Sequence, residues 1–348
     1  MNFEAIRKEA VILNPAKDMQ LKTIPIEVRR DPLTGRTARI CHFRLLRWEK
    51  PDIGAIVAGT ETFCPFCAER VMTATPCFPP DILPEGRLTA GDRVLFPNIA
   101  PYDALGAVAT FGSRHYIPMA EIEPERVAGA VLLAIDFFRR VRAIGHPESV
   151  YHLISWNYMP ASGSSLIHPH LQVFATSTAP NALSRELAAA KAYFRESGRV
   201  YWDDLVAAEK TEGKRYLGRT GRVDWMSAFA PLGVAGDVLG VVEGCATTLE
   251  LDRETVTDIA VGLTRVMAAY DAMGLYNFNV CFFPGAEGDA HARLHVLFSA
   301  RTYFNPALGT PDAAALRILD NDSVCMAVPE EIAEIVRPRF GAPPPGRA

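Results

Sequence analysis

Three polar side chains with phosphate chemistry, His168, His170 and Gln172, stand at alternate positions of one segment. In a β-strand, residues two apart project from the same face, so these three groups would meet one ligand. The Gly- and Ser-rich run 162–165 before them favours a turn that brings backbone N–H groups and hydroxyls close to an anion. Phosphate is the anion that suits this combination.

A neutral imidazole is a competent nucleophile toward phosphorus and also a good leaving group. His170 could therefore hold a nucleotidyl group between two displacements, while Gln172 donates its amide to a non-bridging phosphate oxygen. The alternative from the residues alone is that the two histidines only ligate metal or bond to neighbouring carbonyls. For an isolated His-Pro-His, that simpler interpretation is favoured.

Cys64 and Cys67 are the only closely spaced pair among seven cysteines. Their C-x-x-C spacing lets two thiolates take adjacent corners of a tetrahedron, and two further N or S ligands would close a zinc site. The rival is a redox-active pair, which would follow a strand at the start of a helix. The surrounding segment 52–91 is rich in Pro, Gly and Thr, which indicates a surface excursion ordered by a structural zinc.

The hydrophobic pattern predicts an α+β fold with strands before and after amphipathic helices. A hairpin is expected over 24–47, with its turn at 31–35, and a polar, charged connection is expected over 201–219. The other expected helices are 123–142, 181–194 and 252–273, and the other expected strands are 151–156, 168–176, 225–229, 238–242, 276–283 and 292–300.

The second half of the chain repeats this order, which predicts two similar units, each an antiparallel sheet with helices on one side, over 1–180 and 181–348. Laying 277–279 over 156–158 sets His291, Arg293 and His295 opposite His168, His170 and Gln172. Arginine would then replace the nucleophile in the second unit, and only the first unit would be catalytic. Two unrelated sheet-plus-helix units would give a similar pattern.

Composition excludes several classes of protein. The 348 residues are 49% hydrophobic and carry a formal charge of −4, with a pI near 6.1, so no basic field would attract nucleic acid or anionic lipid. The first 15 residues lack the pattern of a signal peptide, and no apolar stretch has the length of a membrane helix. We therefore expect a cytoplasmic enzyme with no nucleic-acid or membrane partner.

Taken together, the motifs resemble the galactose-1-phosphate uridylyltransferase family of the histidine triad superfamily. The matching segments are 29–35, 64–67, 96–98, His115 and 165–172. The resemblance implies that zinc is held by Cys64, Cys67, His115 and His168. It also implies that His170 is the nucleophile that becomes uridylylated, and that Gln172 bonds the phosphoryl group.

Further binding residues follow only from the resemblance. Arg44 and Arg47 match phosphate-contacting positions, and their alternative is ordinary solvated surface. The matches to nucleotide-contacting positions are Phe96, Asn98, Asn157 and Ser165, with Ser164 in the same phosphate-facing turn. For Phe96 the alternative is a place in the core.

The resemblance thins in the second half. Members of the family often carry a second metal on one glutamate and three histidines, whereas here only Glu186 and His295 fall near matching positions and Leu297 replaces a histidine. We expect this second site to be absent or incomplete. Residues 320–323 occupy the region of the family's hexose contacts without matching them, so the sugar is not specified.

The leading hypothesis is a nucleotidyltransferase of galactose and carbohydrate metabolism. It would move a nucleoside monophosphate, UMP by family default, between a nucleotide sugar and a sugar 1-phosphate through His170, as a homodimer. One alternative is a phosphorylase or hydrolase acting on ADP-sugars or dinucleoside polyphosphates through the same histidine. The other is a non-catalytic, zinc-stabilised nucleotide-binding protein.

Overall fold

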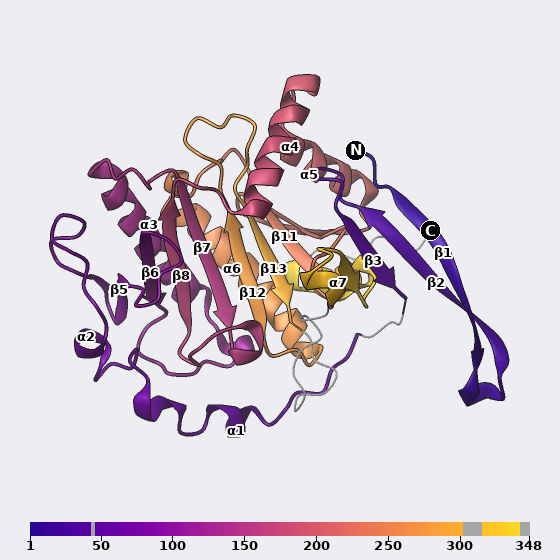
Figure 1. Ribbon diagram of the computed structural model, residues 1–348, viewed down its shortest axis with the longest axis horizontal. Coiled ribbons are helices and arrows are strands. Elements are labelled where there is room, and N and C mark those ends of the chain that lie inside the picture. The colour runs from indigo at the N-terminus through magenta and orange to yellow at the C-terminus, as the bar shows by residue number, and fades with distance from the viewer. Residues whose placement is uncertain (43–45, 302–314, 342–348) are drawn as a thin grey trace.

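The computed structural model describes residues 1–42, 46–301 and 315–341, and one ten-stranded antiparallel sheet forms its body (Figure 1). The strand order is β4-β5-β6-β8-β7-β12-β13-β11-β10-β9. The strands are β4 (Leu88–Ala90), β5 (Arg93–Pro97), β6 (Leu105–Thr110), β7 (Tyr151–Tyr158), β8 (His170–Thr176), β9 (Tyr216–Thr220), β10 (Val223–Ser227), β11 (Asp237–Val242), β12 (Phe278–Phe283) and β13 (His295–Ala300).

A smaller sheet holds the N-terminal strands, in the order β1 (Ala5–Asn14), β2 (Gln20–Arg30), β3 (Thr37–Cys41) and β14 (Ser323–Cys325). The helices are α1 (Ile53–Val57), α2 (Val71–Ala74), α3 (Pro124–Ala143), α4 (Asn181–Ser197), α5 (Tyr201–Glu212), α6 (Arg253–Ala272), α7 (Ala315–Ile318) and α8 (Pro329–Val336). None of the helices in the described part of the chain is long and apolar enough to cross a membrane.

The α+β class is confirmed, and the two halves of the chain contribute to one sheet rather than to two. Each half has the order strand, strand, helix, strand, strand: β5-β6-α3-β7-β8 and β10-β11-α6-β12-β13. The halves meet where β7 pairs with β12. A continuous sheet buries both central strands, which would otherwise expose unpaired backbone groups at an edge.

Helices α3 and α6 pack side by side on one face of the large sheet and enclose the main core. Helix α3 begins with Pro124 and has Arg140 and Arg142 in its last turn, and the Asp252 side chain caps α6 by accepting from the Thr255 N–H. Alternation along the strands sends residues such as Leu171 and Val173 into this core. Their neighbours in sequence therefore face the other side of the sheet.

On the opposite face, Phe66 and Val71 pack over β5 and β6 in the first half, and α5 covers the sheet in the second half. Tyr201, Trp202 and Leu205 pack there against Met226 and Leu239 of the sheet. The expected polar connection over 201–219 is therefore wrong, because this segment forms α5 and β9. The apolar residues of α5 lie on one face of the helix. The segment also contains charged residues that are buried as ion pairs, and in the sequence alone these are typical of a solvated loop.

The predicted hairpin is present as β2 and β3, with Ile26 opposite Cys41. The Asp31 carboxylate accepts from the Leu33 and Thr34 N–H groups, and Gly35 adopts a φ of +72° that completes the turn. Ser323 pairs with Ala38 and so begins the strand β14 that extends this sheet. The Asp322 carboxylate accepts from the Thr37 and Arg39 side chains.

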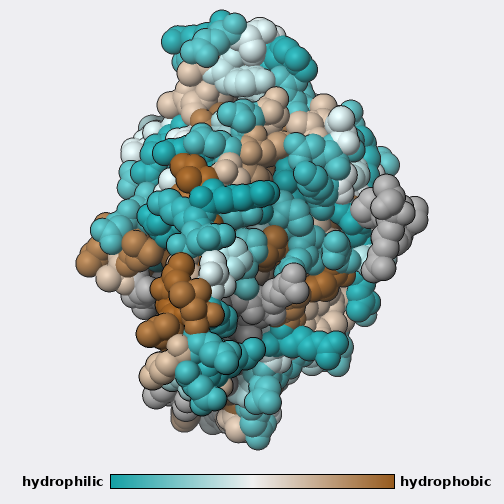
Figure 2. Space-filling model, turned by 90° about the vertical axis from the view of Figure 1, so that its right-hand side faces the viewer, coloured by the Kyte–Doolittle hydropathy of each residue, from teal (hydrophilic) through white to brown (hydrophobic). Residues whose placement is uncertain are grey.

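A second hairpin, made by β1 and β2, was not expected from the sequence and projects from the body (Figure 1). Its outer half exposes large apolar side chains: Val11, Leu13 and Leu21 are 59%, 62% and 68% exposed. Apolar patches are visible on the side of the molecule that carries this hairpin (Figure 2). An exposed apolar two-stranded ribbon is marginal in water by itself.

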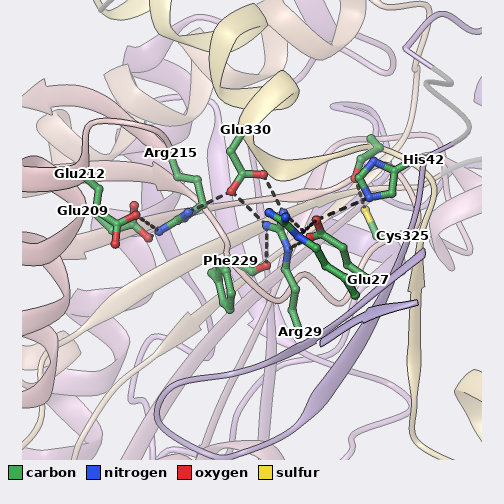
Figure 3. A network of polar contacts seen from close by, with 11 residues as sticks. Glu27, Arg29, His42, Glu209, Glu212, Arg215, Phe229, Cys325 and Glu330 are labelled. Carbon is green, nitrogen blue, oxygen red and sulfur yellow. Dashed lines mark hydrogen bonds and ion pairs between the residues drawn. The ribbon is translucent and has the colours of Figure 1, made fainter. Parts of the chain in front are cut away.

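A buried network of ion pairs joins the small sheet to the second half (Figure 3). Arg215 is 2% exposed and donates to Glu209 at 2.8 Å and to Glu330 of α8 at 2.9 Å. Arg29 of β2 donates to the same Glu330 carboxylate at 2.9 Å. Both guanidinium groups lie over the Phe229 ring. Desolvation raises the pKa of Glu209 to about 7 even though Arg215 lowers it.

We predict that Arg215→Met lowers the free energy of unfolding by about 3 kcal/mol or more, because it leaves buried carboxylates without their cation. The matched control is Arg7→Met, since Arg7 is 88% exposed and lies 3.9 Å from Glu27; it should change stability by about 0.5 kcal/mol or less. Urea unfolding curves of both variants test this. Equal effects of the two substitutions would contradict the structural role of the network.

Candidate active site and metal site

Four side chains that were predicted to bind zinc converge at one place. The ligand atoms of Cys64, Cys67, His115 and His168 all lie within 4.8 Å of one another and could hold a metal ion such as zinc. The Cys67 Sγ lies 3.4 Å from His115 Nδ1 and 3.8 Å from His168 Nδ1. Zinc bonds of about 2.3 Å to sulfur and 2.0–2.1 Å to nitrogen give tetrahedral edges of about 3.6 Å, so the spacing fits.

The remaining ring nitrogens of both histidines are hydrogen-bonded, which fixes the rings. His168 Nε2 donates to the Gly112 carbonyl at 2.8 Å, and His115 Nε2 lies 2.8 Å from the Thr60 hydroxyl. Gly112 adopts a φ of +124°, and a Cβ there would lie 2.6 Å from Asp92 Oδ2, so this carbonyl requires glycine. Such outer contacts leave each Nδ1 lone pair for a metal.

Burial and the adjacent Cys64 raise the pKa of the Cys67 thiol to about 11. Burial also lowers the pKa of His168 to about 4, which keeps its ring neutral. A divalent cation between the two sulfurs would stabilise the thiolate forms that burial disfavours. The donor set therefore suits a soft or borderline metal with four protein ligands and no open position.

His170 lies directly beside this group, as the first residue of β8. It is 4% exposed, and its Nδ1 donates to the His168 carbonyl at 2.8 Å. Burial lowers the pKa of His170, so the ring is neutral with the Nε2 lone pair available. This is the orientation that attack on phosphorus needs.

Gln172 lies on the same face of β8 as His170, as the alternation predicted. Its Oε1 accepts from Asn98 Nδ2 at 2.9 Å, and Asn98 follows β5 and accepts in turn from the Ala100 N–H. The bond from Asn98 orients the Gln172 amide with its NH₂ group away from Asn98. That NH₂ group can donate to an oxygen of a ligand bound beside His170.

The turn before β8 contains side chains that were predicted from the sequence to lie near a phosphate. Ser164 is buried and donates its hydroxyl to the Leu166 carbonyl at 2.7 Å, so its proton stabilises the turn, whereas Ser165 is exposed. Asn157 accepts from Asn279 Nδ2 at 2.6 Å, and Asn279 also donates to the Ser162 carbonyl. Asn279, from the second half, thus ties Asn157 to the turn.

Phe66, between the two cysteines, was not singled out from the sequence. Its ring meets His170 edge-on with centroids 5.2 Å apart and packs 5.1 Å from the Phe96 ring. Phe96 is 2% exposed and belongs to a small cluster with Val94 and Val108. The loop that carries Cys64, Phe66 and Cys67, here called the metal loop, therefore supplies one wall of the site. The position of Phe66 between the two cysteines of the C-x-x-C pair was the only feature of the sequence that could have indicated its place in the site.

The structure describes only one of the two arginines that match phosphate-contacting positions. Arg47 is exposed, and Arg44 falls outside the described residues. The structure therefore brings together the metal set, His170, Gln172, Asn98 and the turn around Asn157.

In the second half, His295 opens β13 as His170 opens β8, and His295 Nδ1 donates to the Arg293 carbonyl two residues before it, at 3.1 Å. Leu297 follows His295 by two residues, as Gln172 follows His170. Asn279, one of the residues used to align the two halves, is the cross-strand partner of Asn157.

The remnants of the expected second metal site are in contact. His295 Nε2 lies 3.2 Å from Glu186 Oε2, and the His295 ring lies between those of Trp202 and Phe283. Within the described ranges, no third histidine, cysteine or carboxylate joins these two in a group suited to a metal.

Comparison with solved structures identifies the class of fold. The chain aligns with a GalT-like protein and with an ADP-glucose phosphorylase with bound ADP-glucose, both from Arabidopsis thaliana, and with a uridylyltransferase. Each match has a TM-score of 0.65 and 18% identity, and covers 90% of this chain and 98% of the other. The chain shares the fold of these GalT-like and uridylyltransferase structures, as the motifs predicted.

The sequence comparison gives the nearer relationship. The chain is 30% identical over 333 residues to an uncharacterized protein of Archaeoglobus fulgidus, a match that covers 95% of this chain and 97% of the archaeal one. The chain belongs to the same family as this archaeal protein. No protein-family model matches the sequence.

We predict that the purified protein carries roughly one zinc per chain, and that Cys64→Ser reduces the zinc content toward zero, because three ligands hold the ion far less tightly. Cys77→Ser is the matched control, since Cys77 is exposed and outside the group. Elemental analysis after gel filtration measures both. Zinc-free parent protein, or full zinc content in Cys64→Ser, would refute the assignment.

Proposed function

We propose that this protein is a nucleotidyltransferase that works by double displacement at His170. In the first step Nε2 attacks the α-phosphorus of a nucleotide sugar, and the bond from that phosphorus to the bridging oxygen breaks. The sugar 1-phosphate leaves, and the nucleoside monophosphate remains on His170. In the second step an oxygen of an acceptor phosphate attacks the same phosphorus, and the P–N bond breaks.

One observation carries this proposal: the His170 Nδ1–H is donated to the His168 carbonyl while Gln172 shares the face of the strand. The neutral imidazole has its lone pair on the ligand side, and the Gln172 amide can stabilise charge on a phosphoryl oxygen. A protein that only binds nucleotides has no need for a nucleophile oriented in this way. The geometry therefore favours catalysis over the binding-module alternative.

Zinc on Cys64, Cys67, His115 and His168 would be structural in this account. When bound, it would order the loop that carries Phe66 and fix His168, whose carbonyl orients His170. The protein residues supply the remaining roles: Gln172 holds the phosphoryl group, Asn98 orients Gln172, and the turn around Asn157 receives the nucleotide.

UMP transfer to a sugar 1-phosphate is our first candidate for the substrate pair. The similarity to an ADP-glucose phosphorylase supports a second candidate, in which adenylate moves from ADP-glucose to inorganic phosphate. Both use the same first step at His170. They differ in the base and in the acceptor, so the two substrates can be compared directly.

We also propose that the two halves, 1–180 and 181–348, are copies of one unit, because their element orders match and His295 occupies the place of His170. Only the first copy would be catalytic. The second copy has Leu297 where the first has Gln172, so it has no amide for a phosphoryl group.

We predict that the parent protein becomes labelled by α-³²P-labelled UDP-glucose or ADP-glucose, that the label is labile to acid, and that His170→Gly shows neither label nor turnover. The reason is that no other imidazole lies beside Gln172 in the described site. His146→Gly, a change at the end of α3, is the control and should label normally. Zinc content should be unchanged in His170→Gly, which separates lost chemistry from lost folding.

If His170→Gly retains activity within about tenfold of the parent, which is roughly 1.4 kcal/mol of barrier, the covalent mechanism is wrong. Rescue of the second half-reaction by a nucleoside phosphorimidazolide would support it. A parent that neither labels nor turns over either nucleotide sugar would leave the binding-module alternative as the better account.

We further propose a homodimer in which the projecting β1–β2 hairpin packs against a second copy of the chain. The apolar residues Val11, Leu13 and Leu21 cross the same face of the hairpin, since Leu13 pairs with Leu21. Burying them against a partner would offset their exposure to water.

We predict that the double variant Leu13→Lys, Leu21→Lys is monomeric at concentrations at which the parent is a dimer, because two charges would have to be buried at the interface. Ile144→Lys is the control, since Ile144 is 50% exposed at the end of α3. Sedimentation velocity distinguishes the states. A double variant that still sediments as a dimer would place the interface elsewhere.

A further inference from the structure

The second half contains a partly open cavity that the proposed reaction does not use. It has a volume of about 90 Å³ and lies between the sheet, α5 and the turn of the β2–β3 hairpin. Aromatic side chains form much of its wall, namely Tyr201, Trp202, Phe229 and Phe283. It occupies the same face of the sheet as His170, but in the half where His295 takes that place.

Two polar side chains of the wall have oxygens without a hydrogen-bond donor among the described residues. Glu209 is 1% exposed and its Oε2 is uncommitted, and Ser227 is completely buried with an uncommitted Oγ. The two are linked, because the Ser227 N–H donates to the Arg215 carbonyl while Arg215 donates to the other Glu209 oxygen. Buried oxygens in this situation require a donor from a ligand or from water.

A third oxygen of the wall, Glu186 Oε2, lies 3.2 Å from His295 Nε2 as an ion pair, but without hydrogen-bond geometry among the described residues. Because the proton on His295 Nδ1 is donated to the Arg293 carbonyl, Nε2 of a neutral His295 ring has no proton for this carboxylate. A cationic donor in the cavity would serve this carboxylate as well.

The charges of the wall favour a cation. Asp31, Glu186, Glu209 and Asp237 contribute four carboxylates. They outnumber the two guanidinium groups that act on the wall, which are Arg36 among the lining residues and Arg215 through its bond to Glu209. Arg36 is already committed to the Ser323 hydroxyl and to the Thr37 and Ala230 carbonyls. Aromatic faces next to carboxylates are a favourable environment for an ammonium group.

We propose that this cavity binds a small primary ammonium ion, whose N–H groups donate to Glu209 Oε2 and Ser227 Oγ and whose carbon atoms contact the aromatic wall. The cavity has no role in the reaction at His170, so this site stands or falls independently of the proposed function. The negative charge of the cavity wall, and its buried oxygens that lack a hydrogen-bond donor, identify the ligand as an amine rather than a phosphate or a sugar.

Isothermal titration calorimetry on the full chain tests the site with methylammonium and ethanolamine as probes, and with tetramethylammonium as a cation that has no N–H donor. We expect saturable binding of at least one of the two primary amines and none of tetramethylammonium, with a matching rise in the thermal midpoint. Ionic strength is held constant with sodium chloride. The parent should label with nucleotide sugar equally well with or without the amine.

Ser227→Ala should weaken binding of the amine by about tenfold or more, and Glu209→Gln should do so as well. Ser227→Ala preserves the fold most closely, because it removes only the uncommitted hydroxyl. Ser197→Ala, at the exposed end of α4, is the control and should bind like the parent. The proposal is overturned if neither primary amine binds at about 10 mM, or if Ser227→Ala binds unchanged; water would then fill the cavity.

Discussion

The site depends on the double use of one residue, His168. Its ring belongs to the group with Cys64, Cys67 and His115, while its backbone carbonyl accepts the Nδ1–H of His170. Since the two histidines are separated only by Pro169, whatever fixes the His168 ring also fixes the carbonyl that orients His170. A structural metal would therefore act on the chemistry through geometry alone. Phe66, on the same metal loop, adds a contact to the His170 ring.

The continuous sheet explains how two similar halves serve different purposes. Both halves present a histidine at the start of the equivalent strand, and both hold its Nδ1 on the carbonyl two residues before it. In the first half the face around His170 carries the metal loop and the Gln172 amide. In the second half α5 covers His295, and Trp202 packs on its ring. The helix, together with the turn of the β2–β3 hairpin, lines a cavity with its own charge pattern on this part of the sheet.

Much of the candidate site could be predicted because its residues fall in short motifs with distinctive chemistry. The alternation from His168 to Gln172 and the C-x-x-C pair, together with the family resemblance that they support, indicate the metal set and the nucleophile from the sequence alone. Contacts between distant segments could not be found in this way. Asn279 supports Asn157 across the seam between β7 and β12, and only the strand register reveals that they are neighbours. Helix α5 was not predicted because charged residues such as Glu209 and Arg215 are typical of exposed loops, whereas here they are buried as an ion pair.

The tautomer of His170 is the most direct test of this account, because every role assigned to the residue follows from the bond to the His168 carbonyl. Long-range ¹H–¹⁵N correlation spectra of metal-loaded protein, with the histidines labelled with ¹⁵N and His170→Gln used for assignment, measure it. The account predicts a neutral His170 ring with its proton on Nδ1 at neutral pH. A ring protonated on Nε2 would place the proton where the phosphorus must bind, and would contradict the mechanism.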